Sequence, residues 1–261
     1  MDQRFKSMLN MLKLLRRLRD VGMVTIYPFP CRVCGQLVTR LADGVGCDNC
    51  WRELTERWAP LMICRKCGRR RLGSVATAGE DEWVCRGCDH LHFHTARAVG
   101  PHEGVVRESV LWLKRHPRIG ERLRSGLRDA WQTLPAPEDF DAVVPIPLHP
   151  RRQAARTFNQ AEVIGRIVSG FADCRLDQTS LVRIRETEQH RLGMGFAERS
   201  RSLQRAFRVV APRLVANRRL LLVDDVLTTG STASEAARTL REGGAREVAL
   251  LTISRVERYH P

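Results

Sequence analysis

Short, uninterrupted apolar runs mark the second half of the chain. They lie within 141–147, 220–223 and 247–255, with a further candidate at 96–100. Runs without alternation are typical of strands that are buried on both faces of a parallel sheet. Apolar residues at helical spacing fall between them, at 105–114 and 233–242. Because strands and helices alternate, the pattern predicts an α/β fold over residues 95–261, with parallel strands flanked by helices and joined by right-handed crossovers.

The first 22 residues have apolar side chains every three or four positions and basic side chains between them. This spacing predicts a basic amphipathic helix, and we treat residues 1–27 as a helical extension. Two interpretations stay open. We prefer a helix packed on its own protein or a loosely ordered extension, and the alternative is a helix on a membrane surface or in a partner's groove.

Residues 28–94 contain eight cysteines in four C-x-x-C pairs. The pairs are Cys31 and Cys34, Cys47 and Cys50, Cys64 and Cys67, and Cys85 and Cys88. Since a glycine follows the first and third pairs, the segment consists of two copies of one small unit. Two thiolates at this spacing chelate one ion from a tight turn, and two such turns complete a tetrahedral site of four cysteines. The spacing predicts a small zinc-ribbon module with one or two structural zinc ions.

The order in which these pairs meet is open. We prefer sequential pairing, with the first two pairs in one site and the last two in another, over an interleaved cross-brace. Redox dithiols are a second interpretation of C-x-x-C. His90, His92 and His94 alternate as on a strand, and we expect ordinary strand residues, with substitution for cysteines as metal ligands as the alternative. The ninth cysteine, Cys174, is expected to be buried and inert.

Arginine dominates the charge of the chain. The 261 residues carry a formal charge of +15, and only four of the 44 basic residues are lysines. This charge suits a polyanionic partner, although the arginines are scattered instead of forming one run. Neither a secretory signal nor the roughly 20 apolar residues of a transmembrane helix is visible. We therefore expect a cytoplasmic protein without a transmembrane segment, in which paired cysteines are metal ligands.

The strongest functional signal follows the apolar run at 220–223. Asp224 and Asp225 are expected to end that strand, at the place where open α/β sheets bind ligands. Small and hydroxyl residues then lead into a helix: Thr228, Thr229, Gly230, Ser231 and Thr232. Free N–H groups at a helix start bind phosphate, and the carboxylates suit vicinal sugar hydroxyls. The stretch predicts a ribose 5-phosphate site, and the alternative is an ordinary turn with a Ser/Thr cap.

Arginines in two other segments are candidates for phosphate contacts. Arg151, Arg152 and Arg156 follow the run at 141–147, and a guanidinium binds phosphate oxygens through two donors. A solvated basic helix start is the alternative. Residues 180–207 lack a period over their middle, which favours either a lid that places Arg183, Arg185 and Arg191 on phosphate, or an unstructured surface loop.

The acidic pair and its T-T-G-x-T loop resemble the phosphoribosyl pyrophosphate (PRPP) motif of type I phosphoribosyltransferases. Together with the cysteine pairs, the residues before Lys114, and the stretches 143–162 and 183–207, they resemble the ComF family. The resemblance covers nearly everything after about Tyr27 and implies a type I phosphoribosyltransferase fold behind a zinc module. It also implies that Asp224 and Asp225 hold the ribose hydroxyls, that 228–232 holds the 5-phosphate, and that Mg²⁺ bridges ribose and pyrophosphate.

Other residues fall on motif positions of that family: Lys114, Arg151, Arg152, Asn159 and Gln160. Of these, we take Lys114, Arg151 and Arg152 as pyrophosphate contacts. The chain departs from the family at Thr157, where R-G-F-N-Q is usual, and at Ser202, where asparagine is common, which affects details of the helix start and the lid. In competent bacteria the resemblance implies a role in taking up single-stranded DNA during natural transformation, alongside the uptake helicase and recombination mediators.

Two hypotheses of function follow. In the first, the protein is an enzyme that transfers ribose 5-phosphate from PRPP to a nitrogen nucleophile, although no residue is recognisable as a base or an acceptor pocket. In the second, it is a non-catalytic adaptor that senses PRPP or a nucleotide and docks single-stranded DNA or competence proteins. A third, weaker hypothesis is a regulator of double-stranded DNA, for which the sequence offers no helix-turn-helix.

Overall fold

The computed structural model describes residues 29–40, 43–58, 61–75, 83–155, 157–186 and 203–257. The predicted N-terminal helix, Arg156, Arg191 and the middle of the predicted lid lie outside these ranges. Within them, no helix is long and apolar enough to cross a membrane.

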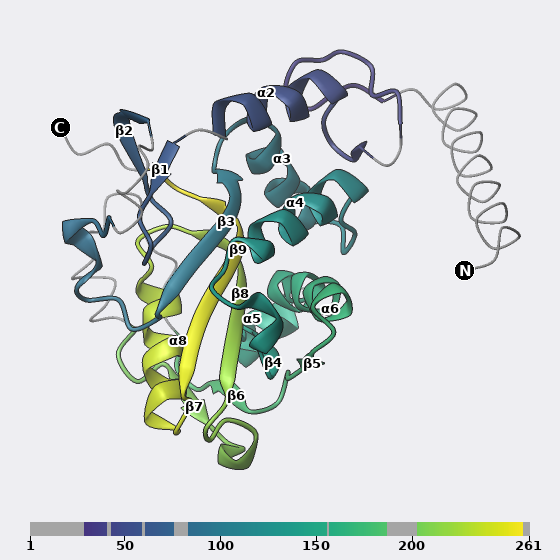
Figure 1. Ribbon diagram of the computed structural model, residues 1–261. Coiled ribbons are helices and arrows are strands. Elements are labelled where there is room, and N and C mark those ends of the chain that lie inside the picture. Colours follow the sequence, from purple (N-terminus) through teal and green to yellow (C-terminus); the bar gives the residue numbers. More distant parts are fainter. Residues whose placement is uncertain are drawn as a thin grey trace, which may run out of the picture.

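A five-stranded sheet forms the centre of the molecule (Figure 1). Its strands are β3 (Thr95–Pro101), β4 (Ala142–Pro145), β5 (Arg175–Leu176), β8 (Arg219–Leu227) and β9 (Glu247–Arg255). They lie in the order β3-β9-β8-β4-β5, and each neighbouring pair is parallel. The predicted parallel sheet is therefore confirmed.

Strand β8 is longer than the sequence predicts. Asp224 and Asp225 were expected to end it, but the strand continues to Leu227. The reason is its partner, because β9 offers pairing positions as far as Arg255, which lies opposite Leu227. The two acids are thus held in extended strand geometry, shortly before the glycine-containing loop.

Helices cover both faces of the sheet (Figure 1). On one face lie α3 (Gly104–Leu113), α4 (Glu121–Gln132) and α6 (Gln160–Ala172), and on the other lies α8 (Ser231–Glu242). Successive side chains of β8 point to opposite faces, so Leu221 and Val223 join the core under the first three helices while Leu220 and Leu222 join the core under α8. Double burial explains why the run is apolar at every position.

Shorter elements connect these layers. They are η3 (Pro137–Asp139), α5 (Pro150–Ala155), β6 (Leu181–Arg183), β7 (Phe207–Val209) and η4 (Pro212–Leu214). Strands β6 and β7 form an antiparallel pair, with Leu181 opposite Val209. The two ends of the segment expected to be irregular, 180–207, are therefore fastened to each other.

The cysteine segment has its own short elements: α2 (Asp48–Trp58), β1 (Leu61–Ile63), β2 (Arg70–Val75) and η2 (Arg86–Cys88). The prediction of a strand through the three histidines is wrong. His90 lies in a turn closed by the bond from Leu91 N–H to the Cys88 carbonyl, and β3 begins only at Thr95. Because the chain turns directly after Cys88, its first sheet residue comes after the three alternating histidines and not among them.

Both halves of the cysteine segment pack against the sheet domain. Trp51 and Val45 share one core with Val105 of α3. Leu91 and Phe93 share the other core with residues of β8 and α8. The described residues of the cysteine segment therefore contribute to the hydrophobic cores on both faces of the sheet.

Candidate functional site

A crevice is expected where β4 and β8 lie side by side. They pair in parallel from Ala142 opposite Leu220 to Pro145 opposite Val223. The chain leaving β4 passes through α5 into α6 on one face, whereas the chain leaving β8 enters α8, which lies on the other. Strands whose following helices depart to opposite faces leave room between their carboxyl ends, which is where open α/β sheets bind ligands.

The loop after β8 occupies one wall of this region. Gly230 adopts a left-handed conformation with φ 83°, and α8 begins at the next residue. The hydroxyls of Thr229 and Ser231 lie 2.9 Å apart, and the Ser231 N–H points to Thr229 Oγ1 at 3.4 Å. Hydroxyls and the first N–H groups of a 12-residue helix are thus gathered at one point, an arrangement that suits a phosphate group.

The structure brings Asp224 and part of this loop to one small cavity. A small cavity of about 30 Å³ is lined by Asp224, Thr228, Gly230 and Thr232, among other residues. Asp225, Thr229 and Ser231 adjoin it along the chain but do not line it. The predicted carboxylate for the sugar and the predicted cradle for its phosphate therefore face one space.

Asp224 is under electrostatic strain in this cavity. Burial, and then the neighbouring Asp225 carboxylate, raise its pKa to about 8, although the charge of Arg183 acts in the opposite direction. The Asp225 N–H donates to Asp224 Oδ1 at 2.8 Å. A hydroxyl-rich or cationic ligand would relieve this strain, and such a shifted carboxylate is typical of functional sites.

His102 belongs to the same edge of the sheet and was not predicted. It directly follows β3, and its Nδ1 lies 2.8 Å from Ser254 Oγ of β9. That hydroxyl in turn lies 3.4 Å from the Asp225 carbonyl oxygen. Burial lowers the pKa of His102, as does the charge of Lys114, whereas Asp225 raises it. Lys114 is therefore close enough for its charge to act on this edge of the sheet. In the sequence, His102 could have been found as a titratable residue that directly follows a predicted strand.

The arginines predicted for pyrophosphate lie on α5, shortly after β4. Arg151 is exposed and forms an ion pair with Glu186, with Nη1 and Oε2 3.0 Å apart. This pair connects the chain after β4 with the chain after β6. Arg152 occupies the next position of the same short helix.

Asn159 has a structural role: it connects the start of α6 to the loop after β4. Its Oδ1 accepts from the Ala161 N–H at 3.0 Å and so caps α6, while its Nδ2 donates to the Ile146 carbonyl at 3.1 Å. The side chain is buried. One asparagine thereby fastens the start of α6 to the loop that leaves β4.

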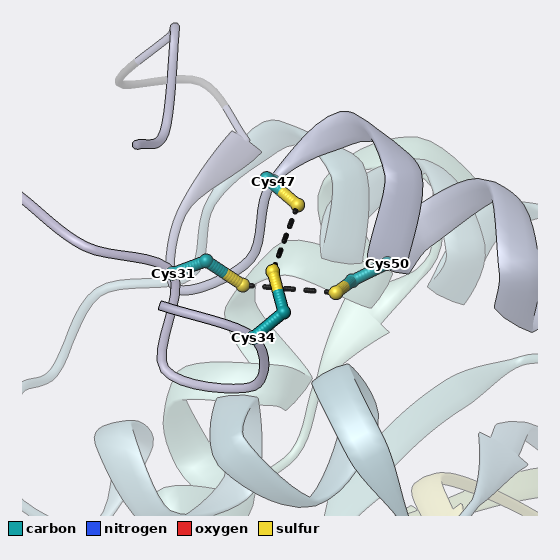
Figure 2. Close-up of side chains that lie close together, drawn as sticks. All are labelled: Cys31, Cys34, Cys47 and Cys50. Carbon is teal, nitrogen blue, oxygen red and sulfur yellow. Dashed lines mark hydrogen bonds between the residues drawn. The ribbon is translucent and has the colours of Figure 1, made fainter. Parts of the chain in front are cut away.

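The eight paired cysteines form two clusters, each able to hold a metal ion. Cys31, Cys34, Cys47 and Cys50 make the first, and Cys64, Cys67, Cys85 and Cys88 the second. This is the sequential order and not the interleaved one. Figure 2 shows the four sulfur atoms of the first cluster pointing toward one another, with Cys50 on α2 and Cys47 just before it.

The two clusters repeat one backbone pattern. In each, the glycine after C-x-x-C is left-handed, with φ 76° at Gly35 and 68° at Gly68. Each of these glycines donates its N–H to the carbonyl of the first cysteine of its pair, at 2.9 and 2.8 Å. The residue after that cysteine, Arg32 or Arg65, donates to a carbonyl two positions before the third cysteine. The repeat inferred from spacing is therefore also a repeat of geometry.

Sulfur–sulfur distances fit a tetrahedral metal. The bridging contacts are 3.7 and 3.6 Å in the first cluster and 3.6, 3.6 and 3.2 Å in the second. A tetrahedron with Zn–S bonds of about 2.3 Å has edges of roughly 3.8 Å. No disulfide joins any of the nine cysteines. The donor sets fit zinc, which would stabilise each pair of turns when bound.

The ninth cysteine lies apart from both clusters. Cys174 is half-buried, and burial, followed by the charge of Asp173, raises the pKa of its thiol. It is less buried than the sequence led us to expect.

Comparison with known proteins identifies the family. A model of the phosphoribosyl transferase domain matches residues 113–259. The DNA utilization protein YhgH of Salmonella typhi is 37% identical over 244 residues, which cover 89% of this chain and 99% of that protein. The chain belongs to the ComF family of phosphoribosyltransferase-like proteins.

Other relatives of this ComF protein match over shorter regions. YhgH of Escherichia coli O6:H1 is 38% identical over 116 residues, which cover 44% of this chain and 49% of that protein. Competence protein F of Haemophilus influenzae is 32% identical over 151 residues, covering 57% and 63% of the two chains. The matched regions thus span about half of the E. coli relative and under two thirds of the Haemophilus one.

Proposed function

We propose that this ComF protein binds PRPP with Mg²⁺ at the carboxyl edge of its sheet and acts in the utilisation or uptake of DNA. The observation that carries the proposal is the cavity that Asp224 lines together with Thr228, Gly230 and Thr232. The names of the relatives, DNA utilization protein and competence protein, support the biological setting. A cytoplasmic location and the division into 1–27, 28–94 and 95–261 are parts of the same proposal.

Each group in the crevice has a role in this proposal. The carboxylates of Asp224 and Asp225 accept hydrogen bonds from the ribose hydroxyls. The hydroxyls and N–H groups of residues 228–232 hold the 5-phosphate. Lys114, Arg151 and Arg152 neutralise the pyrophosphate, and Mg²⁺, when bound, assists its departure by offsetting the developing charge. Catalysis would then transfer the ribosyl group to a nitrogen nucleophile, mainly through positioning.

The cysteine clusters have a structural role in the proposal. Four thiolates occupy all tetrahedral positions of each zinc, so no position remains for a catalytic water. We therefore assign two structural zinc ions, one to each cluster.

A non-catalytic adaptor is the second candidate function, and one surface feature favours it. Trp112 and His116 stack with ring centroids 3.8 Å apart, and the Arg32 guanidinium lies 4.8 Å from the Trp112 ring. Aromatic and arginine planes of this kind at a surface suit single-stranded nucleic acid. On this alternative the PRPP pocket is a sensor, and the protein docks single-stranded DNA or competence proteins such as a helicase or recombination mediator, with strong salt dependence for DNA.

Calorimetric titration of PRPP with Mg²⁺ tests the site. We expect the native protein to bind and a double variant, Asp224→Asn with Asp225→Asn, to lose at least about tenfold in affinity, because the neutral amides cannot serve as charged acceptors. Asp173→Asn is the matched control, since this exposed acid follows α6 at the opposite edge of the sheet and asparagine tolerates its φ of 50°. Equal affinity in all three proteins would disprove the assigned site.

A second assay separates the two functions. Pyrophosphate release in the presence of a panel of nitrogen acceptors supports the enzyme. PRPP binding without release across the panel, together with salt-dependent binding of single-stranded DNA, supports the adaptor.

A further inference from the structure

The chain that leaves the second cysteine cluster packs directly against the loop at 228–232, which we call the phosphate loop for its proposed role. We call residues 90–93, which follow Cys88, the strap. The Ser234 hydroxyl in the first turns of α8 bonds to two backbone groups of the strap. Ser234 Oγ donates to the His90 carbonyl at 3.2 Å and accepts from the His92 N–H at 3.1 Å. Ser234 is buried, so these two bonds use its donor and an acceptor position away from solvent.

The strap also packs against the glycine of the loop. A Cβ on Gly230 would stand 3.0 Å from Leu91 Cδ2 and 3.8 Å from Phe93 Cε1. Both side chains are buried in one core with Leu227 and Ala233, the residues on either side of the loop. The left-handed turn at Gly230 is therefore closed against the strap, which leaves the loop little freedom to move toward it.

At its other end, the strap is anchored by the cysteine cluster. Cys88 Sγ lies 3.6 Å from Cys64 Sγ, and the Cys85 N–H points to the same Cys64 sulfur at 3.3 Å. Arg255 at the end of β9 reaches Cys67 Sγ with Nη2 at 3.4 Å. A metal held by these four sulfurs would fix Cys88, and with it the strap, relative to β9 and the loop after β8.

The first cluster has no comparable connection among the described residues. It packs in the core under α3, α4 and α6, on the other face of the sheet from α8. Removing its metal would therefore not act on the strap through a direct contact. This contrast within one chain makes the two clusters controls for each other.

We infer that the strap is a positioning element of the phosphate loop, and that the second metal centre, but not the first, sets the affinity of the loop for a ribose 5-phosphate. The inference rests on the proposed function, because it concerns the same loop. Metal release at the second centre would lower affinity for the sugar phosphate by freeing the strap.

Ser234→Ala tests this connection while all eight paired cysteines stay in place. We expect about a tenfold loss in affinity for ribose 5-phosphate, measured by calorimetry with Mg²⁺, because two buried hydrogen bonds to the strap are lost. Thr239→Val is the matched control: its hydroxyl is buried on the same helix but bonds only to the Glu235 carbonyl, at 2.9 Å. Zinc content of both variants should equal that of the native protein.

Single cysteine variants test the contrast between the centres. Cys88→Ser should lose one zinc and weaken ribose 5-phosphate binding, whereas Cys50→Ser should lose one zinc and keep native affinity. Circular dichroism checks that each cysteine variant is folded. If one is unfolded, the inference is judged on the affinity of Ser234→Ala alone. Native affinity in Ser234→Ala, or equal weakening in folded Cys50→Ser and Cys88→Ser, would overturn the inference.

Amide hydrogen exchange distinguishes this inference from the proposed function. If the native protein binds neither PRPP nor ribose 5-phosphate, the proposed function fails, but the strap is still judged by exchange at residues 230–234. Faster exchange there in Ser234→Ala than in Thr239→Val supports positioning by the strap. Unchanged exchange contradicts it.

Discussion

Asp224 occupies an unfavourable position for a carboxylate. It lies inside β8 opposite Thr252, beside a second acid, and in a cavity that Thr228 and Gly230 also line. Its raised pKa reflects burial first and the Asp225 charge second. A buried acid of this kind lowers the stability of the unliganded protein. Such destabilising groups are common at functional sites, where they serve binding.

Replacing Asp224 by asparagine should stabilise the unliganded protein at alkaline pH. The pKa of Asp224 rises from about 3.9 in the unfolded chain to about 8 in the folded state. The protonated form contributes stability that is fully present below about pH 4 and is lost as pH rises through about 8. Asp224→Asn avoids this loss, so its advantage in free energy of unfolding should grow with pH, to on the order of 1–2 kcal/mol once solvent screening is allowed for.

Thermal melts of native protein, Asp224→Asn and Asp173→Asn at about pH 5 and pH 8 measure this. The Asp224→Asn advantage in Tm should be small at the lower pH and larger at the higher pH, and Asp173→Asn should follow the native protein. An advantage for Asp224→Asn that is equal at both pH values would show that its proton is not linked to folding.

Among individual residues, the sequence predicts those site residues that lie close to one another along the chain. Asp224 and Thr228 are close in the chain, so one strand and one turn bring them to one cavity. His102 and Ser234 depend on partners more than 140 positions away, namely Ser254 and the strap. No spacing rule within one sequence encodes such a pair.

The ends of helices and strands are likewise predicted where the local sequence determines them and missed where a distant partner does. The start of β9 at Glu247 and its end at Arg255 match the predicted strand, because its apolar run is continuous and buried on both faces. The end of β8 was misplaced because pairing with β9 extends it past two acids. Helix α2 was not predicted from the sequence, because cysteines and charged residues interrupt the helical spacing of its apolar residues. Trp51, on the buried face of α2, belongs to the same core as residues of α3.

Helix α6 depends on one asparagine for its start. Asn159→Ala should lower the free energy of unfolding by about 2 kcal/mol, because it removes the cap of α6 and leaves the Ile146 carbonyl without its donor. Asn159→Asp keeps the capping oxygen but not the Nδ2 donor, so its loss should be smaller. Urea unfolding of the three proteins measures the order. Equal stability of Asn159→Ala and native protein would show that the cap and the loop after β4 are fastened by other contacts.

On the scale of the whole molecule, the cysteine clusters lie in the layers of the sheet domain. The first cluster belongs to the core under α3, α4 and α6, and the second to the core under α8. Spacing alone predicted the candidate ligands and favoured their sequential pairing, while an interleaved order stayed open. Spacing did not predict this division between two faces, because the packing of a metal-binding turn on a distant sheet leaves no periodic signal.

Removing the metal should therefore destabilise the sheet as well as the cysteine segment. Structural zinc contributes about 10–16 kcal/mol per site in isolated zinc-binding units, which is comparable to the whole stability of a typical domain, about 5–15 kcal/mol. We expect a strong chelator to lower Tm for the entire chain in differential scanning calorimetry, with one transition before and after treatment. If 28–94 instead folds as an independent unit, chelation will leave a separate sheet transition at its original temperature. Restoring zinc should return the native Tm, because a reversible effect separates metal loss from damage to the cysteines.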